Sequence, residues 1–140
     1  MQHSSFNDRK IFNDPVYGFI PVGDPLLFDI IEHPWFQRLR RIKQLGMTDM
    51  VYPGALHTRF HHSVGAMHLM NHAINALRLK KVEISDNERR NAAIAILLHD
   101  IGHGPFSHAL ENSIISGIDH EVVSRLYMDR LNEVFDGKLN

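Results

Sequence analysis

Residues 96 to 108, which read ILLHDIGHGPFSH, are the stretch that decides the fold of this chain. The apolar lead-in predicts a helix that ends at the adjacent pair His99 and Asp100, because two glycines and a proline follow at once. At a helix end, both side chains can lean toward one point in front of the helix. An imidazole nitrogen and a carboxylate oxygen on one point suit a divalent metal ion. The alternative is a core helix that merely ends in polar residues.

A metal site needs a third ligand from elsewhere in the chain. His62 is the best candidate, because it lies near the start of a predicted long helix that could pack antiparallel to the helix ending in His99. The alternative is His68 with His72, a pair one turn apart on a single helix face. That pair lacks the nearby glutamate of the zinc-protease pattern, which favours a surface or supporting role for it.

The composition limits the classes of partner and cofactor. The chain has 15 Lys and Arg residues against 16 Asp and Glu, which argues against binding to long nucleic acids or to an anionic membrane surface. It has no cysteine, so any metal must be held by histidine and carboxylate. No stretch approaches the roughly 20 apolar residues of a membrane span, and the first residues do not resemble a signal peptide. We therefore expect a cytoplasmic protein.

The pattern along the chain is helical except near the N-terminus. Residues 10–25 alternate apolar and polar side chains between Gly and Pro, which predicts a strand pair or an extended arm. We expect helices over residues 26–31, 34–45, 58–80, 86–99, 105–115 and 119–135. The fold class is therefore all-α, with an arm over residues 1–24 and a helical domain over residues 25–140.

The apolar spacing predicts which face of each helix is buried. In the long helix, the expected inner residues are Phe60, Val64, Met67, Asn71, Ile74 and Leu77. In the last helix, they are Val122, Val123, Leu126, Leu131, Val134 and Phe135. The helix over residues 34–45 has a basic face, formed by Arg38, Arg40, Arg41 and Lys43. Such a face is either solvated or binds phosphates.

Three motifs carry a resemblance to a known family. RFHHSVG at 59–65, LLHDIGHGPFSH at 97–108 and DHE at 119–121 together resemble the HD-domain phosphohydrolases. NDPVYG at 13–18 and HPWFQRLRRIKQLG at 33–46 resemble more specifically the deoxynucleoside triphosphate triphosphohydrolases. The resemblance implies an HD-domain helical bundle with a short extended or β-hairpin N-terminal arm. It also implies a metal-dependent enzyme that releases a deoxynucleoside and inorganic triphosphate.

The resemblance implies a ligand set for the metal. His62, His99 and Asp100 match the metal ligands, and a fourth carboxylate is expected from a later helix that this chain does not contain. We therefore expect residues 25–140 to be the N-terminal part of an HD domain. The ion could be Fe, Mn, Mg, Zn or Ni, because mixed histidine and carboxylate sites accept most of them.

The resemblance also implies roles around the metal. Arg59 and His103 would bind the phosphates of the substrate, and Gln44 would lie near its sugar. His108 would be the general acid, Glu111 would orient it, and His120 would line the same pocket. A histidine with a pKa near ~6.5 can protonate a leaving oxygen at neutral pH.

A regulatory site follows from the same resemblance. Some members bind an activating nucleotide between subunits of a homo-oligomer, and the matching positions are Lys10, Asn13, Glu32, Gln37 and Arg40. Glu32 stands where guanine-reading members have Asp, and His61 replaces an expected acidic residue. Ordinary packing with a solvated basic face is the alternative for this region.

Two alternatives to the triphosphohydrolase remain. One is an HD phosphohydrolase that acts on another nucleotide phosphoester, although smaller enzymes of that kind need no such N-terminal arm. The other is a non-catalytic module for nucleotide binding or oligomerisation. The presence of all five expected residues argues against such a module; they are His62, His99, Asp100, His103 and His108. The missing fourth ligand argues for it.

Overall fold

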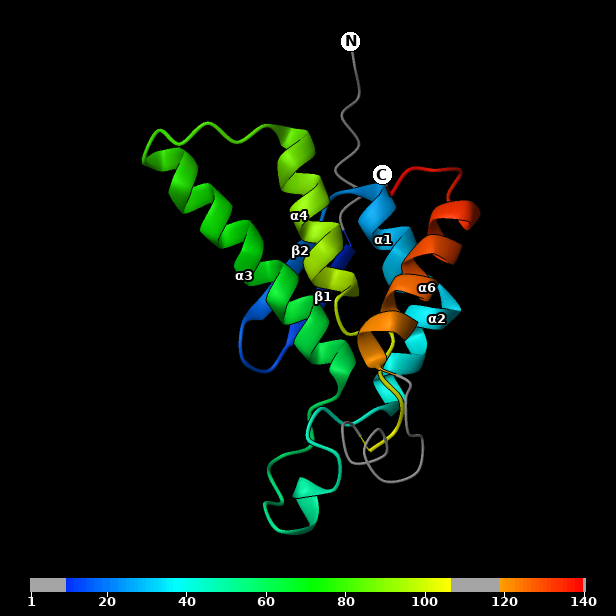
Figure 1. The fold of residues 1–140 in the computed structure, drawn as a ribbon. Coiled ribbons are helices and arrows are strands. Elements are labelled where there is room, and N and C mark those ends of the chain that lie inside the picture. Colours follow the sequence, from blue (N-terminus) through cyan, green and yellow to red (C-terminus); the bar gives the residue numbers. More distant parts are fainter. Residues whose placement is uncertain (1–9, 107–118, 140) are drawn as a thin grey trace.

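A β-hairpin and a bundle of helices make up the computed structural model, which describes residues 10–106 and 119–139 (Figure 1). Strand β1 (Lys10–Asp14) pairs antiparallel with β2 (Gly18–Val22), so that Phe12 lies opposite Ile20. The Asp14 carboxylate accepts hydrogen bonds from the backbone N–H groups of Val16 and Tyr17 and so closes the turn. The prediction of a strand pair at the N-terminal end is confirmed.

Helices follow the hairpin in the predicted order. The α-helices are α1 (Pro25–Glu32), α2 (Pro34–Gln37), α3 (Arg59–Leu79), α4 (Asp86–Leu98) and α6 (His120–Val134). Two short 3₁₀ helices, η1 (Arg38–Arg41) and η2 (Thr48–Met50), lie between α2 and α3. Most of the helix expected over residues 105–115 lies outside the described residues.

Side chains that cap the helices explain where they begin. Ser85 Oγ accepts a hydrogen bond from the Glu88 N–H, and the Glu88 carboxylate accepts one from the Ser85 N–H, which is the capping box expected at α4. At α3, the same reciprocal box joins Thr58 and His61. The Thr58 N–H donates to Nδ1 of His61, so an imidazole does here what a glutamate does in the usual box. This explains how α3 begins without the acidic residue expected at position 61.

The predicted helix over residues 34–45 is wrong in its second half. The α-helix ends at Gln37, a 3₁₀ turn follows, and Ile42 is extended with φ −112° and ψ 111°. From there the chain pairs with the segment before α3, since the Arg59 N–H donates to Ile42 O and the Gln44 N–H donates to His57 O. This pairing between distant segments outweighs the local helix propensity of the sequence.

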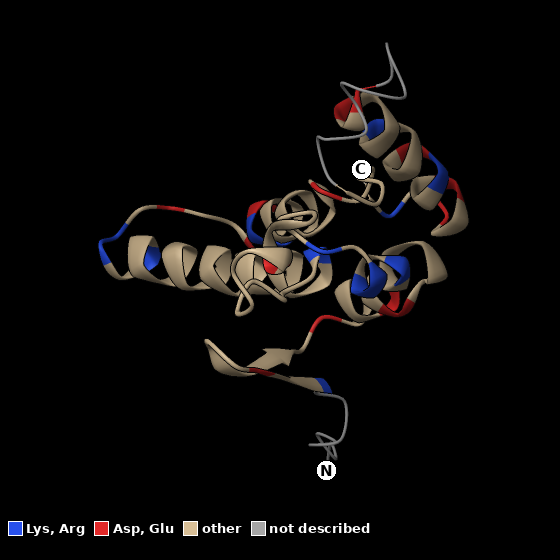
Figure 2. Ribbon diagram, turned by 90° about the horizontal axis from the view of Figure 1, so that it is seen from below, with Lys and Arg blue, Asp and Glu red and all other residues tan. Residues whose placement is uncertain are grey.

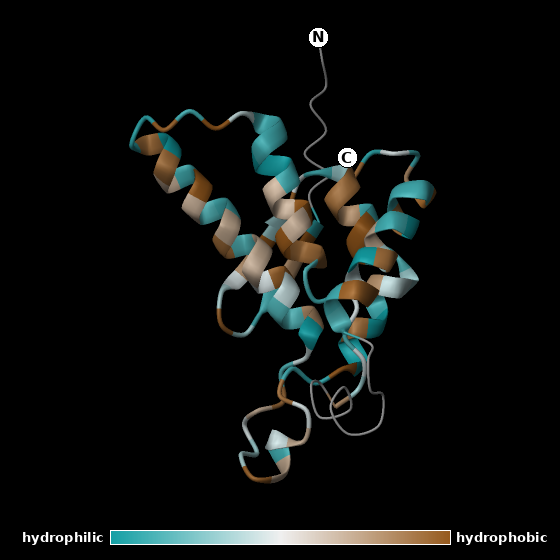
Figure 3. Cartoon of the chain, in the orientation of Figure 1, coloured by the Kyte–Doolittle hydropathy of each residue, from teal (hydrophilic) through white to brown (hydrophobic). Residues whose placement is uncertain are grey.

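The hydrophobic core lies where α1, α2, α3, α4 and α6 meet, and β2 adds to it. Hydrophobic residues concentrate along these inward faces in Figure 3. The core residues with less than 2% exposure are Ile20, Ile30, Ile31, Phe36, Leu39, Met67, Ala93, Leu97, Leu98, Ile101 and Leu131. Because Ile20 and Val22 belong to this core, the hairpin is packed on the helical domain.

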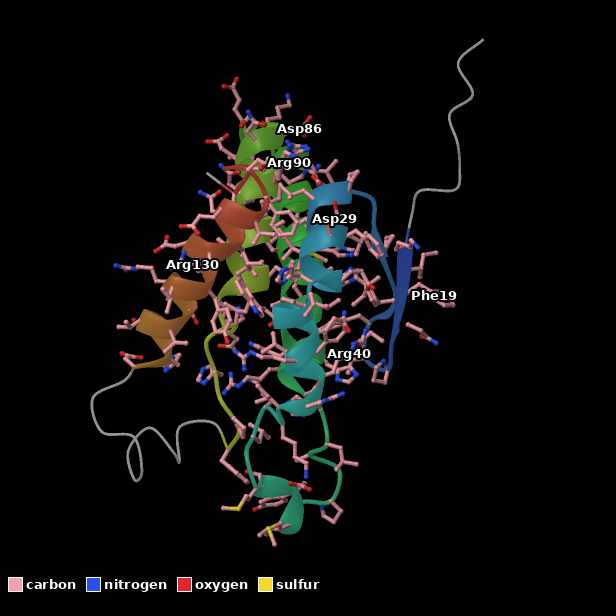
Figure 4. All side chains as sticks on the ribbon, turned by 90° about the vertical axis from the view of Figure 1, so that its right-hand side faces the viewer. Phe19, Asp29, Arg40, Asp86, Arg90 and Arg130 are labelled. Atoms are coloured by element: carbon pink, nitrogen blue, oxygen red, sulfur yellow. The ribbon has the colours of Figure 1, made fainter. Side chains whose placement is uncertain are left out.

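The hairpin turn also touches α3 closely. A Cβ added at Gly65 would lie 2.9 Å from Cε2 of Tyr17, so only glycine fits there without moving the ring. The opposite side of the hairpin faces away from the helices, where Phe19 on β2 is exposed (Figure 4).

Two predicted helix faces need correction. In α6, Val122 and Leu126 are 67% and 59% exposed, and Val134 is exposed too, whereas Ser124 and Leu131 are buried. The reason is a backbone contact: α6 lies so close to Gly102 that a small polar side chain, Ser124, faces inward at that point. In α3, Leu77 is exposed, because α3 and α4 diverge toward the loop that joins them (Figure 1). The other apolar residues expected on the inner face of α3 are buried.

Candidate metal centre

His62, His99 and Asp100 meet at one point of the structure. The start of α3 lies beside the end of α4, as antiparallel packing of the two helices requires. His62 Nε2 is 3.1 Å from His99 Nε2, and it is 3.7 Å from Oδ2 of Asp100. Oδ1 of Asp100 is 3.5 Å from His99 Nε2. Among the described residues, this is the one group of three or more such side chains close enough to hold a metal ion.

The spacing of these atoms fits a shared ion. Ligand atoms that are each about 2.1 Å from one metal lie about 3.0 Å apart at right angles and about 3.4 Å apart in a tetrahedron. The separation of 3.1 Å between the two histidine nitrogens and the 3.5 Å from His99 Nε2 to Oδ1 of Asp100 are close to these values. The 3.7 Å from His62 is to the other carboxylate oxygen, Oδ2. Small side-chain rotations would bring all three groups to binding distance.

The hydrogen bond of His99 prepares it as a ligand. Nδ1 of His99 lies 2.6 Å from the carbonyl oxygen of Ile96, and a carbonyl can only accept. Nδ1 therefore carries the proton, and in the neutral ring Nε2 keeps its lone pair for the metal. Burial lowers the pKa of His62 below its usual 6.5, against the opposing effect of Asp100, and this also favours the neutral ring that metals bind.

Asp100 lies between Arg59 and the histidine rings. Nη1 of Arg59 lies 2.5 Å from Oδ2 of Asp100, and both side chains are buried. Burial alone would raise the pKa of the Asp100 carboxyl, but the charges of His99, Arg59 and His103 together outweigh it and lower the pKa. Asp100 is therefore a carboxylate at neutral pH. Its Oδ2 faces Arg59, and its Oδ1 faces the two histidines His99 and His103.

A pocket of about 520 Å³ opens beside these ligands. It is lined by Gln44, Leu45, Gly46, Met47, Thr48, Arg59, His62, Asp100, His103, Phe106 and His120. The expected substrate-binding residues Gln44, Arg59 and His103 thus share one pocket with two of the candidate metal ligands, His62 and Asp100. Oε1 of Gln44 is buried and has no hydrogen-bond partner among the described residues, so it is available to accept a bond from a ligand.

His103 and His120 stack on each other at the wall of this pocket. Their ring centroids are 4.0 Å apart with an interplanar angle of 17°, and His103 is only 2% exposed. The stack depends on how α6 docks. Ser124 Oγ accepts a hydrogen bond from the Gly102 N–H and donates one to the carbonyl oxygen of His99, which ties α6 to the turn after α4. Sequence reasoning missed Ser124, although a serine among the larger residues of α6 was a visible signal.

The alternative histidine pair lies on a different cavity. The rings of His68 and His72 are 4.4 Å apart and face a cavity of about 810 Å³ between β2, α3 and the start of α4. The arginines Arg78 and Arg90 of that cavity are paired with Asp86 and Asp24. No third metal-binding side chain joins the two histidines among the residues that the structure describes.

The expected regulatory residues lie on the hairpin side of the molecule. Lys10, Asn13 and Glu32 are exposed, and the Lys10 amine lies 4.9 Å from the centroid of the Phe28 ring. The Arg40 guanidinium lies over the Phe60 ring at 3.6 Å, and its Nε donates to Gln37 Oε1. Phe12 of β1 packs on the same ring of Phe60, so the hairpin and η1 meet there. His108 and Glu111 lie outside the described residues.

Comparison with known proteins identifies the family. A family model described as HD domain matches residues 59–137. The chain belongs to the HD-domain family. Its similarity to other HD proteins extends beyond this range to the hairpin. Over 138 residues it is 44% identical to the deoxynucleoside triphosphate triphosphohydrolase SAMHD1 of Danio rerio, and over 108 residues it is 47% identical to the human SAMHD1.

Bacterial relatives of this HD domain are also similar. The uncharacterized protein YwfO of Bacillus subtilis is 42% identical over 123 residues, which cover 88% of this chain. A crystal structure of a phosphohydrolase from Bacteroides thetaiotaomicron superposes with a TM-score of 0.90 at 55% identity and covers 94% of the chain. The prediction of an HD-domain fold with an N-terminal hairpin is therefore confirmed.

The chain spans only part of these relatives. It covers 28% of the Bacillus protein, 22% of the Danio rerio protein, 17% of the human protein and 32% of the Bacteroides chain. In the part that the structure describes, no helix is long and apolar enough to cross a membrane. Positive and negative residues alternate along α6, whereas α3 has no acidic residue and α1 has no basic one (Figure 2).

Proposed function

We propose that this chain forms the metal-binding part of a phosphohydrolase that converts a deoxynucleoside triphosphate into a deoxynucleoside and inorganic triphosphate. The observation that carries the proposal is the cluster of His62, His99 and Asp100 on the wall of a pocket that also holds Arg59, His103 and Gln44. The SAMHD1 relatives, which are named for this reaction, support the choice of substrate.

The ligand set fits a divalent ion of intermediate hardness, such as Fe, Mn, Mg, Zn or Ni. When bound, such an ion supplies positive charge to the phosphoryl oxygens and lowers the pKa of a water molecule. The resemblance also implies a fourth ligand, a carboxylate.

The chain's own residues would bind and orient the substrate. Arg59 lies at the bottom of the pocket with its charge partly balanced by Asp100, and His103 lies beside it; both would face the phosphates. Gln44 would accept a hydrogen bond from a sugar hydroxyl through its Oε1, which has no partner among the residues that the structure describes. His120, stacked on His103, would keep that ring in place.

The reaction would be hydrolysis at the α-phosphorus. The oxygen of water forms a bond to phosphorus and releases a proton to the solvent, the bond from phosphorus to the 5′-oxygen breaks, and the 5′-oxygen takes up a proton to leave as a hydroxyl group. We assign this proton to His108, with Glu111 as the carboxylate that orients its ring. Both assignments rest on the resemblance of the motif.

Regulation is a second part of the proposal. Lys10, Asn13, Glu32, Gln37 and Arg40 would bind an activating nucleotide between subunits of a homo-oligomer. The meeting of β1 and Arg40 at Phe60 supports this, because it puts a cation of η1 next to the hairpin. We also propose a cytoplasmic location, in keeping with the sequence.

The test is a product scan on the protein with its metal content measured. The protein is incubated with dNTPs, NTPs and nucleoside monophosphates, and inorganic triphosphate and phosphate are measured separately. We expect bound metal and triphosphate released from dNTPs. Phosphate released from monophosphates would instead identify an HD enzyme for another phosphoester. Nucleotide binding without any turnover would identify a non-catalytic module.

A further inference from the structure

Arg38 contacts the turn that follows the metal ligands of α4. Its Nη1 donates a hydrogen bond of 2.8 Å to the carbonyl oxygen of His103, and its Nη2 donates one to the carbonyl oxygen of Ile101. The spacing of basic residues predicts that Arg38 belongs to a face that is either solvated or binds phosphates. In the structure, its guanidinium instead points inward and binds the protein's own backbone.

The two carbonyl groups need such a partner. They lie just past the end of α4, where backbone carbonyls have no further helical N–H groups to bind, and where the negative end of the helix dipole favours a cation. The planar guanidinium carries parallel donors on two nitrogens, one for each carbonyl, whereas a lysine would have to bind both carbonyls from a single nitrogen. Arg38 therefore fixes the direction of the backbone on both sides of Gly102.

Arg38 also joins this turn to α6. Its guanidinium carbon lies 4.9 Å from the centroid of the Tyr127 ring, and Tyr127 packs edge-on against Trp35 of α2. One side chain of η1 thus contacts the turn with His103 and the helix with His120, the two residues whose rings stack. The relative position of these rings depends on both contacts.

We propose that Arg38 is a positioning residue, which holds the turn between Asp100 and His103 against α6 and thereby aligns the metal ligand and the histidine stack. Where it concerns metal affinity, this inference rests on the proposed function. The alignment of the stack does not depend on a metal.

The experiment compares Arg38→Gln with Arg41→Gln. Arg41 lies on the same 3₁₀ helix and is exposed, so its replacement removes the same charge without removing the inward contacts. The first measurement is the nuclear Overhauser effect between the rings of His103 and His120 in the metal-free protein. The second is the dissociation constant for Mn²⁺, and the third is a thermal unfolding curve that checks the fold.

In Arg38→Gln, we expect the nuclear Overhauser effect between the His103 and His120 rings to be lost. We also expect Mn²⁺ to bind about tenfold more weakly, as is usual when a residue that supports a metal ligand is removed. Arg41→Gln should behave like the original protein in both measurements. Arg38→Lys keeps the charge but replaces the two-nitrogen fork with a single nitrogen on a shorter side chain, so it should lie between the two.

An Arg38→Gln protein that keeps the ring-to-ring effect and binds Mn²⁺ within twofold of the original would overturn the inference. If Arg38→Gln does not fold, Arg38→Lys decides in its place, and original behaviour in that variant would overturn the inference equally. If the unaltered protein binds no Mn²⁺, the metal proposal fails, while the effect between His103 and His120 still decides whether Arg38 positions the stack.

Discussion

The Nε2 atoms of His62 and His99 lie 3.1 Å apart, although 37 residues separate the two histidines in the chain. Two neutral rings at this distance can share one proton, or both can bind one ion. Asp100 adds a negative charge beside them, which favours the ion.

Replacing His62 should remove metal binding. We expect His62→Ala to weaken Mn²⁺ binding by about 100-fold or more, because losing a ligand costs at least as much as losing a group behind one. His72→Ala is the matched control, since it removes an exposed histidine from the same helix. Titration with Mn²⁺ measures both. Equal affinities for the two variants would show that His62 is not a ligand.

Replacing Arg59 should destabilise the metal-free protein. Arg59→Met leaves the buried Asp100 without its ion-pair partner, and breaking a buried pair typically costs about 3–5 kcal/mol. The pKa of Asp100 should rise in this variant. A saturating divalent ion should restore part of the stability, because it replaces the lost positive charge. Urea unfolding with and without Mn²⁺ measures this, and a loss that Mn²⁺ leaves unchanged would contradict the proposed ligand role of Asp100.

Acid should destabilise the metal-free protein through His62. Because its pKa is lower in the folded state than the usual 6.5, the unfolded chain takes up the proton first as the pH falls. The contribution of His62 to stability is therefore complete above pH 6.5 and decreases as the pH falls toward the folded-state pKa. When the pH is lowered from above 6.5 to below it, the free energy of unfolding should decrease less for His62→Gln than for the original protein. Equal decreases would mean that His62 does not contribute.

A side chain at Gly102 should separate α6 from the turn. A Cβ there would lie 2.3 Å from the Ser124 backbone nitrogen and 2.4 Å from the His120 carbonyl oxygen. Backbone atoms cannot move aside as a side-chain end can, so we expect Gly102→Ala to cost about 1–3 kcal/mol. At Gly104, a Cβ would have no atom within 4 Å, so Gly104→Ala is the control. Thermal unfolding of the two variants is the measurement, and equal melting temperatures would rule out the close contact.

The start of each long helix could be predicted from the sequence, because its cause is local. The capping side chains Ser85 and Asp119 accept hydrogen bonds from N–H groups no more than three residues away. Both partners of each bond can therefore be read from one short stretch of sequence. The clustering of His62 with His99 and Asp100 could also be predicted, because the last two are adjacent in the chain and only the third residue remained to be found. The hairpin was visible for the same reason, in its alternating residues.

The features that could not be predicted depend on distant partners. The early end of α2 results from pairing between Ile42 and Arg59, and the inward direction of Arg38 results from carbonyl groups in the turn after α4. The buried face of α6 is set by its contact with Gly102. The apolar periodicity describes one segment at a time. It therefore predicted that the large apolar residues of α6 are buried, although the backbone at Gly102 leaves no room for them on that face.

The antiparallel pairing of α3 and α4 also bears on the order of events during folding. His99 and Asp100 are neighbours in any conformation of the chain, but His62 joins them only after the two helices have packed. An unfolded chain therefore offers an ion two adjacent ligands at most from this set, and the native chain offers three. An ion in solution would then bind the native state preferentially and slow its unfolding, so that the rate of unfolding would depend on the concentration of free metal.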